Sequence, residues 1–259
     1  MDTTVRPPFA TPHLSLWLTI CLPLLCVHFG PTADARPHQI PAAATRAAKP
    51  VRSSQADLSD SYYRLDRLLA VDIELSPTGW DSLRTQSRTL ADILGGEDCL
   101  DGPADDIFSW FRATVTVDGE THTEVAVRKK GFLGSLSTEK PSLKVRFDKF
   151  VDDQFLGGIL KRLTLNNAQQ DPSMINPCLS YHIFSSAGLP APRCNFAKLR
   201  VNGEDLGLYV QVESIKTRFV ERNFTDSNGN LYEGTISDFR PKWRGTFEKK
   251  TNEDQRDWT

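Results

Sequence analysis

The chain has 259 residues, of which 39% are hydrophobic and 25% are charged, so a packed core is expected and wholesale disorder is excluded. Its formal net charge is −2 and its sequence pI is about 6.2, which argues against a nucleic-acid-binding protein, since such proteins are normally basic. The length allows one ordinary domain with additional segments.

The N-terminal 35 residues are predicted to be a signal peptide. The interrupted apolar run at 14–30 is shorter than the roughly 20 apolar residues that cross a bilayer comfortably. An Ala-Asp-Ala cleavage pattern follows at 33–35. We therefore expect a mature chain that begins at Arg36, is secreted or held at the cell surface, and has no stable membrane span.

The next segment, 36–60, is rich in Ala, Pro, Arg and Ser and nearly lacks large apolar residues. Such a segment cannot bury enough apolar surface to offset its conformational entropy, so we expect a disordered linker. One domain is then expected over 61–259. Its first strand is predicted at 69–75 from the alternation of apolar and polar residues, with Ser76-Pro77 capping a helix that follows.

Two hairpins are predicted from their turn residues. Asp118-Gly119 separates two alternating runs, and Asn202-Gly203 separates another two. Further strands are expected at 142–147 and 161–165, and short helices at 175–187 and 216–223. Strands followed by a helix and then more strands indicate an α+β fold.

The helix at 175–187 is expected to turn Leu179, Ile183 and Phe184 inward. Asp171 precedes this helix and is interpreted as a capping or turn residue, because Asp is common in both positions. No acidic residue occurs on the helix itself.

Three cysteines remain after signal cleavage: Cys99, Cys178 and Cys194. In an oxidising compartment one disulfide and one leftover thiol are expected, with the pairing left open. No Cys-x-x-Cys spacing occurs, so no zinc site is predicted. Asn223 begins an Asn-Phe-Thr acceptor triplet for glycosylation, or a chance match to it.

The chemistry-bearing segment runs from 128 to 147. A phosphate-binding site needs a glycine-containing turn that lets the backbone approach, together with fixed cations on strands. Lys144 and Arg146 share one face of their predicted strand, with Leu143 and Val145 on the other. The alternative is an ordinary solvated basic face. The candidate phosphate-facing residues are Arg128, Gly131, Ser135, Lys140 and Lys144.

Five segments, in this order and spacing, carry a family resemblance: 127–132 (VRKKGF), 140–147 (KPSLKVRF), 165–167 (LNN), 202–214 (NGEDLGLYVQVES) and 229–234 (GNLYEG). Together they resemble the spore-coat protein H (CotH) kinase-like family of atypical, secreted protein kinases. The resemblance implies an atypical protein-kinase-like N-lobe, made of antiparallel strands and a helix, with the start of a second lobe.

The same resemblance implies ATP and Mg²⁺ as cofactors and a surface or extracellular protein as the phosphate acceptor. Lys144 and Lys140 would contact the phosphates. The segment that ends at Glu213 resembles the hinge beside adenine, where Glu213 either contacts the ligand or only shapes the hinge; both interpretations stay open.

The catalytic acids and metal ligands of the family would follow residue 259, so we expect a truncated domain that lacks turnover by itself, with no catalytic or metal residue assigned. Phe219, Leu231 and Phe247 would then be partly uncovered. A non-catalytic coat-assembly module and, more remotely, a carbohydrate-binding protein are the alternatives.

Overall fold

The computed structural model describes residues 57–89, 92, 102, 106–132 and 134–254, all of which belong to one compact unit. The predicted signal peptide, residues 36–56 of the predicted linker and Cys99 lie outside the described residues.

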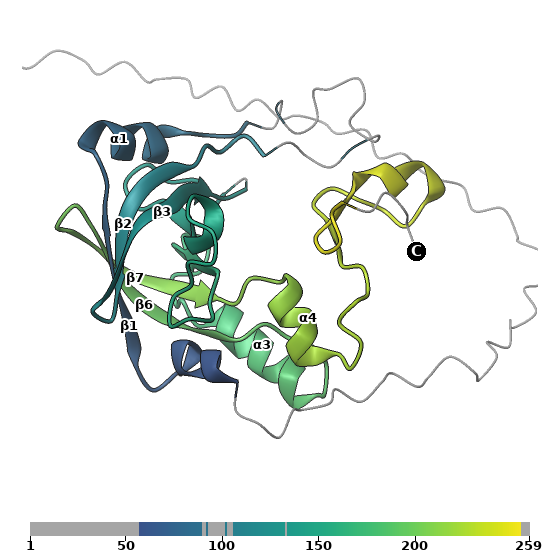
Figure 1. Cartoon of the computed structure of the whole chain (residues 1–259). Helices are drawn as coiled ribbons and strands as arrows, with labels where there is room; N and C mark the ends of the chain where they lie inside the picture. Colours follow the sequence, from purple (N-terminus) through teal and green to yellow (C-terminus); the bar gives the residue numbers. More distant parts are fainter. Residues whose placement is uncertain (1–56, 90–91, 93–101, 103–105, 133, 255–259) are drawn as a thin grey trace, which may run out of the picture. The chain divides into compact units, whose positions relative to one another are not determined.

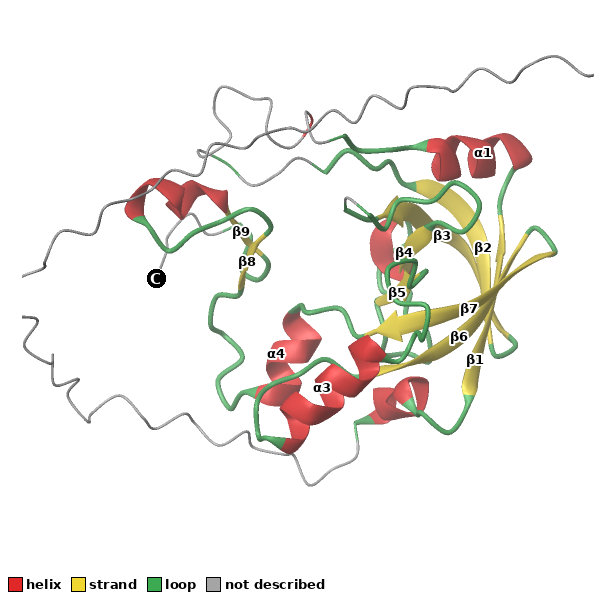
Figure 2. Ribbon diagram, turned by 180° about the vertical axis from the view of Figure 1, so that it is seen from behind, coloured by secondary structure: helices red, strands yellow, loops and turns green. Residues whose placement is uncertain are grey.

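Seven strands close into a barrel in the order β1-β2-β3-β4-β5-β7-β6 (Figures 1 and 2). Neighbouring strands are antiparallel except β1 and β6, which run parallel and complete the ring. The strands are β1 Leu68–Glu74, β2 Phe111–Val117, β3 Glu120–Lys130, β4 Ser142–Arg146, β5 Arg162–Asn166, β6 Cys194–Val201 and β7 Glu204–Val212.

The barrel interior is the main hydrophobic core. Alternate residues of each strand point inward, as the period of two requires, and most of them are Val, Leu or Ile. Val71, Val115, Val127, Leu143 and Leu165 are at most 1% exposed. The predicted α+β class is confirmed, whereas the closure of the strands into a ring was not part of the prediction.

Both predicted hairpin turns are confirmed. Asp118 and Gly119 join β2 to β3 with φ of 48° and 90°, and Asn202 and Gly203 join β6 to β7 with φ of 49° and 83°. Two consecutive residues with positive φ are the mark of the type I′ turn, whose twist matches that of the flanking strands.

Short helices lie around the barrel, with α3 and α4 next to each other in both views (Figures 1 and 2). The Ser76 hydroxyl accepts a hydrogen bond from the Gly79 N–H at 3.1 Å, so the predicted cap of α1 is confirmed. The helical segments are η1 Leu58–Tyr63, α1 Pro77–Thr85, η2 Phe147–Lys149, α3 Asn176–Ser186, α4 Thr217–Asn223 and η3 Pro241–Thr246; two short strands, β8 Tyr232–Gly234 and β9 Phe247–Lys249, form a separate hairpin.

Asp171 lies in the turn before α3, where a turn or capping residue was predicted: its carboxylate accepts from the Asn176 N–H at 2.9 Å and from the Ser173 N–H at 3.2 Å. The predicted inward face of α3 is wrong, however. Leu179, Ile183 and Phe184 are 50–56% exposed. Apolar residues occur all round this helix, so its pattern does not specify a face. The disulfide between Cys178 and Cys194 holds the helix to β6 and buries Cys178 instead.

Two further expectations change. Phe219 was expected to be partly uncovered, but it is only 6% exposed because α4 buries its Phe219–Val220 side, whereas Leu231 and Phe247 are half-buried as expected. Ordered structure also begins before residue 61, where the domain was predicted to start. Asp57 caps η1 and pairs with Arg218 at 2.6 Å, which fastens the last residues of the predicted linker to the domain.

Candidate functional site

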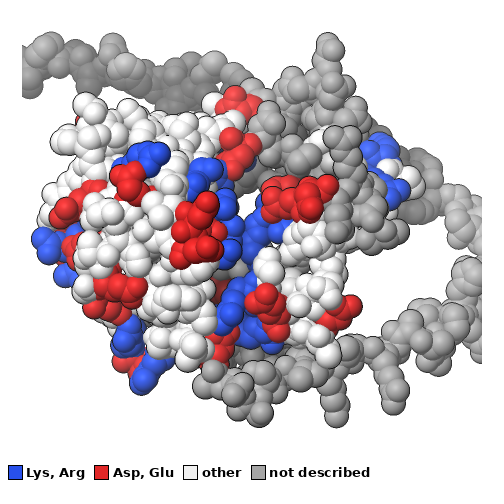
Figure 3. Space-filling model, in the orientation of Figure 1, with Lys and Arg blue, Asp and Glu red and all other residues white. Residues whose placement is uncertain are grey.

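A basic face covers the outside of β3, β4 and β5. The register pairs Arg128 with Lys144, and Arg146 with Arg162, so their side chains share the surface opposite the barrel core. Figure 3 shows Lys and Arg side chains gathered in a band across the visible face of the molecule, flanked by acidic groups. The strand alternation that buries Leu143 and Val145 produces this face, as the sequence predicted for Lys144 and Arg146.

Arg128 is held firmly at one side of the basic face. Its guanidinium pairs with Asp106 and lies 4.5 Å from the centre of the Trp110 ring. Its side chain is only 12% exposed. A guanidinium stacked on indole and paired with a carboxylate is fixed in direction, so Arg128 provides a rigid edge to the site.

Lys144 lies at the centre of the face. Burial lowers the pKa of its ammonium group, and the positive charges of Arg128 and Lys250 lower it further, while Glu233 and Asp106 act in the opposite direction. Among the described residues, no carboxylate lies within ion-pair distance of Lys144. A partly buried cation without a carboxylate partner is a feature of sites that bind an anion.

Lys130 is a site residue that the sequence reasoning missed. It follows Arg128 by two positions on β3 and therefore faces the same side as Lys144, and its ammonium group donates to Asn166 Oδ1. Burial and the neighbouring charge of Lys144 lower its pKa to about 8. The period of two within the basic run was the signal that could have identified it, since the intervening Lys129 points inward and donates to the Arg84 carbonyl at 2.6 Å.

The glycine turn after β3 closes on itself. Gly131 and Gly134 have φ of 145° and 85°, which favour glycine. The Ser135 hydroxyl accepts from the Phe132 N–H and donates to the Phe132 carbonyl, each at 3.0 Å, and Asn167 donates to the Ser135 carbonyl at 3.1 Å. Glycine-favouring backbone angles thus occur in this segment, while the Ser135 hydroxyl is engaged in hydrogen bonds to the Phe132 backbone.

Lys140 is directed away from the basic face. Its ammonium nitrogen lies 5.1 Å from the centre of the Tyr209 ring, a buried residue of the barrel interior, and burial lowers its pKa. Tyr209 in turn donates to the Pro141 carbonyl at 3.1 Å. The structure therefore brings Arg128, Lys130 and Lys144 together and leaves Lys140 beside an aromatic ring.

Glu213 lies in an ion-pair network at the end of β7. One carboxylate oxygen lies 2.7 Å from Arg193 Nη2 and the other 2.5 Å from Arg222 Nη2. The Arg193 N–H also donates to it at 3.0 Å. With its side chain 3% exposed and both oxygens engaged, Glu213 joins β6, β7 and α4, which favours the shaping role over ligand contact.

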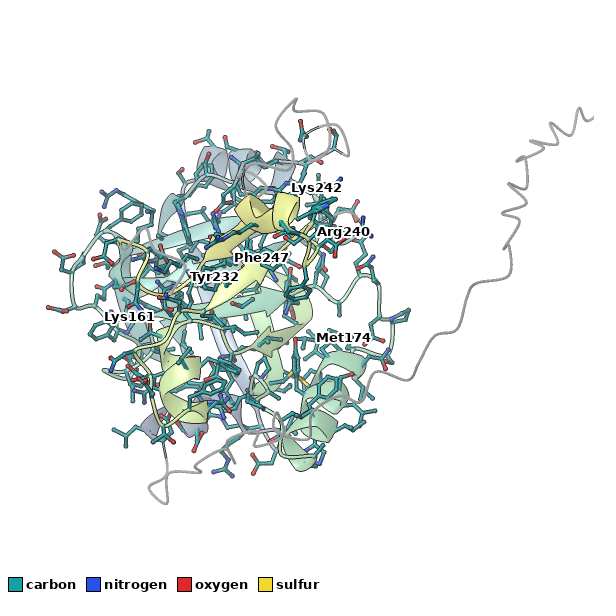
Figure 4. The ribbon with its side chains drawn as sticks, turned by 90° about the vertical axis from the view of Figure 1, so that its right-hand side faces the viewer. Lys161, Met174, Tyr232, Arg240, Lys242 and Phe247 are labelled. Atoms are coloured by element: carbon teal, nitrogen blue, oxygen red, sulfur yellow. A yellow bond between two sulfur atoms is a disulfide. The ribbon has the colours of Figure 1, made fainter. Side chains whose placement is uncertain are left out.

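The β8–β9 hairpin supplies the acidic side of the site. Lys250, just after β9, pairs with Glu233 at 2.7 Å and also with Glu248, which lies opposite Glu233 in the register. Figure 4 looks onto this hairpin, with Tyr232 and Phe247 near its middle and Arg240 and Lys242 at its η3 end.

Within the described residues, no three His, Cys, Asp or Glu side chains gather closely enough to hold a metal ion. The donor set present on the basic face is made of ammonium, guanidinium and amide groups, so it fits phosphate oxygens and does not fit Mg²⁺. In the same part of the chain, no helix is both long and apolar enough to cross a membrane.

Comparison with known proteins points to one family. A family model described as "CotH kinase protein" matches residues 127–259, just over half of the chain. The chain is 33% identical over 76 residues to an inner spore coat protein H-like protein of Bacillus subtilis (strain 168), covering 29% of this chain and 23% of that protein. It is 25% identical over 109 residues to inner spore coat protein H of the same organism, covering 38% and 30%. The matches span less than a third of either relative.

Proposed function

The chain belongs to the CotH kinase family, and we propose that its barrel is the kinase-like N-lobe that holds the phosphates of ATP in a secreted CotH-type protein kinase. The observation that carries this proposal is the pair of partly buried ammonium groups of Lys130 and Lys144, which no described carboxylate neutralises. Their site lies beside a glycine-containing turn and a rigid Arg128.

The chemistry follows from charge. The negative charges of a triphosphate repel one another. Cations fixed on strands neutralise these charges and do not have to move when the phosphoryl group is transferred. The basic face presents three such cations on two adjacent strands, and Asn166 adds an amide that can accept or donate. Mg²⁺ ordinarily neutralises part of the developing charge in phosphoryl transfer, but the described residues offer no carboxylate set for it. These residues therefore bind and orient phosphate, and no catalytic step is assigned to them.

The compartment and the acceptor are inferred from separate observations. The Cys178–Cys194 disulfide favours an oxidising environment and thus export through the predicted signal peptide. The two similar proteins are named for the inner spore coat, which supports a coat or surface protein as the substrate.

A non-catalytic assembly role is the second candidate. It is favoured by α3 and the residue before it, which expose Ile175, Leu179 and Ile183 at intervals of four residues, each at least 50% exposed. A contiguous exposed apolar stripe often marks a surface that contacts another protein. The phosphate-binding proposal and this alternative differ in whether the basic face binds a nucleotide.

Calorimetric titration of the chain with ATP tests the proposal. Lys144→Ala should weaken binding by about ten- to a hundredfold, since a charge-assisted contact contributes roughly 1.5–3 kcal/mol. Arg146→Ala is the matched control. Arg146 shares the strand face but already pairs with Asp148 at 2.8 Å, so its removal should cost clearly less. Equal small losses, or no ATP binding at all, would leave the assembly role as the better account.

A further inference from the structure

Helix α3 has one side packed on the barrel and another side in solvent. Met174, Cys178 and Tyr181 belong to a small apolar cluster with the outward side chains of β6 and β7. The disulfide between Cys178 and Cys194, whose Cα atoms are 5.2 Å apart, fastens the helix to β6. The solvent side is therefore presented on a fixed support, and a partner that binds it does not have to order the helix first.

Large apolar side chains gather on the solvent side. Ile175, Leu179 and Ile183 are 53%, 50% and 56% exposed. They lie four residues apart, so they form one continuous ridge along the helix, which we call the α3 ridge. Phe184 and Leu189, at the end of the helix and just beyond it, are 50% and 53% exposed. This concentration of exposed apolar surface indicates a contact with another protein surface.

The segment that carries the α3 ridge has no charged side chain. No Asp, Glu, Lys or Arg occurs between residues 172 and 192, although 25% of the chain is charged. In a dimer with two-fold symmetry, a side chain near the axis meets its own copy, so a charge there would repel itself. An uncharged ridge avoids this repulsion and offers nothing for a charged partner to complement. The charge pattern thus favours a second copy of the same chain.

The order of residues in the α3 ridge favours the same partner. Isoleucine, leucine and isoleucine at equal spacing read the same in both directions. If two copies cross antiparallel, Leu179 meets Leu179 of the second copy, and Ile175 lies near Ile183 of the second copy on both sides of the axis. Ridges with a spacing of four residues interdigitate at about −50°, which is the commonest helix packing in globular proteins. The ridge is therefore complementary to itself.

We propose that the α3 ridge is the contact surface of a homodimer in which two α3 helices cross antiparallel with Leu179 at the two-fold axis. A helix of 11 residues offers a small surface, so the dimer should be weak, with a Kd of about 10–100 µM. The dimer does not depend on the proposed function, because α3 packs on β6 and β7 whereas the basic face lies on β3, β4 and β5.

Sedimentation equilibrium between about 5 and 500 µM protein tests the dimer, since this range brackets the expected Kd. The unaltered chain should change from monomer to dimer. Leu179→Asp should raise the Kd at least about tenfold, because it places two like charges at the axis. Leu65→Asp is the matched control: Leu65 is 58% exposed and lies outside α3, so the Kd should stay within about twofold. Thermal unfolding checks that each variant is folded.

Two double variants test the antiparallel arrangement. Ile175→Lys combined with Ile183→Glu should keep the dimer, because each introduced cation would face an introduced anion of the second copy. Ile175→Lys combined with Ile183→Lys should lose the dimer, because only like charges would meet. Both pairs replace exposed side chains, so the fold should tolerate them equally.

The outcomes decide the proposal. A chain that stays monomeric throughout this range, or a dimer that Leu179→Asp leaves intact, overturns it and leaves the α3 ridge to a different partner. Equal loss of the dimer in both double variants overturns the antiparallel arrangement. Lys144→Ala should dimerise like the unaltered chain even where its ATP binding is lost, so failure of the dimer and failure of the proposed function are seen separately.

Discussion

The network around Glu213 and the face around Lys144 both bury charge, but only the network provides partners of opposite charge. Glu213 is enclosed by two guanidinium groups and a backbone N–H, with both oxygens engaged. Lys130 and Lys144 are crowded by other cations, and no described carboxylate pairs with either. A buried charge that the protein itself neutralises becomes costly only when its partner is removed, whereas one left for an outside partner already costs stability and indicates a binding site.

Breaking the ion-pair network around Glu213 should give the largest change in stability. Glu213→Gln leaves Arg193 and Arg222 buried beside an uncharged amide, so the free energy of unfolding should fall by about 3–5 kcal/mol in a urea titration. Glu221→Gln is the control, since Glu221 is 48% exposed and lies 3.9 Å from Arg218. A loss below about 1 kcal/mol for Glu213→Gln would mean that the network contributes little to stability, and the contrast with the basic face would fail.

Removing a charge from the basic face should change stability in the opposite direction. Lys130→Met should raise the free energy of unfolding by about 2 kcal/mol at pH 7, because the folded state no longer holds a cation whose pKa is lowered. The unaltered chain should gain stability as the pH rises above about 8, because Lys130 is still protonated in the unfolded form there but loses its proton in the folded form. The difference in stability between the two chains should therefore disappear toward pH 10.

The charged groups that shift the pKa of Lys130 are Lys144 from β4 and Glu233 from β8, and its hydrogen-bond partner is Asn166 from β5. Denaturant titrations of both chains between pH 7 and 10 measure the gap. A constant gap over this range would show that Lys130 keeps an ordinary pKa and that the basic face is simply solvated.

The smallest expected effect concerns Asp57, whose carboxylate pairs with Arg218 and with Arg193, a member of the Glu213 network. Burial would raise its pKa, but hydrogen bonds from Ser59 and Arg218, with the charge of Arg193, outweigh this and lower it to about 2. Its contribution to stability is therefore present above about pH 4 and lost as the pH falls toward 2. Asp57→Asn should cost about 1–2 kcal/mol at pH 7 and nothing near pH 2.

Thermal unfolding of Asp57→Asn and of the unaltered chain at pH 7, 4 and 2.5 measures this difference. Asp66→Asn is the control, since Asp66 is exposed and pairs with the exposed Arg64. If the two substitutions cost the same at pH 7, residues 57–60 would not be fastened to the domain by Asp57.

Local chemistry was enough to predict several parts of the molecule. The turns at Asp118-Gly119 and Asn202-Gly203, and the helix cap at Ser76, depend on residues within a few positions of each other. The placement of Lys144 and Arg146 on one face follows from the period of two along a strand. These features need no knowledge of distant segments, because steric limits and short hydrogen bonds decide them.

The tertiary structure decided the rest. Closure of the barrel depends on the pairing of β1 with β6, and the exposure of Leu179 depends on which side of α3 the disulfide draws to β6. The gathering of Arg128, Lys130 and Lys144 on one face likewise depends on the register of β3 with β4, and the influence of Glu233 on the pKa of Lys144 depends on where the β8–β9 hairpin lies, more than 80 residues further along the chain. Charges separated this far in sequence interact only after the chain has folded, so their interaction is a property of the fold and not of any local pattern.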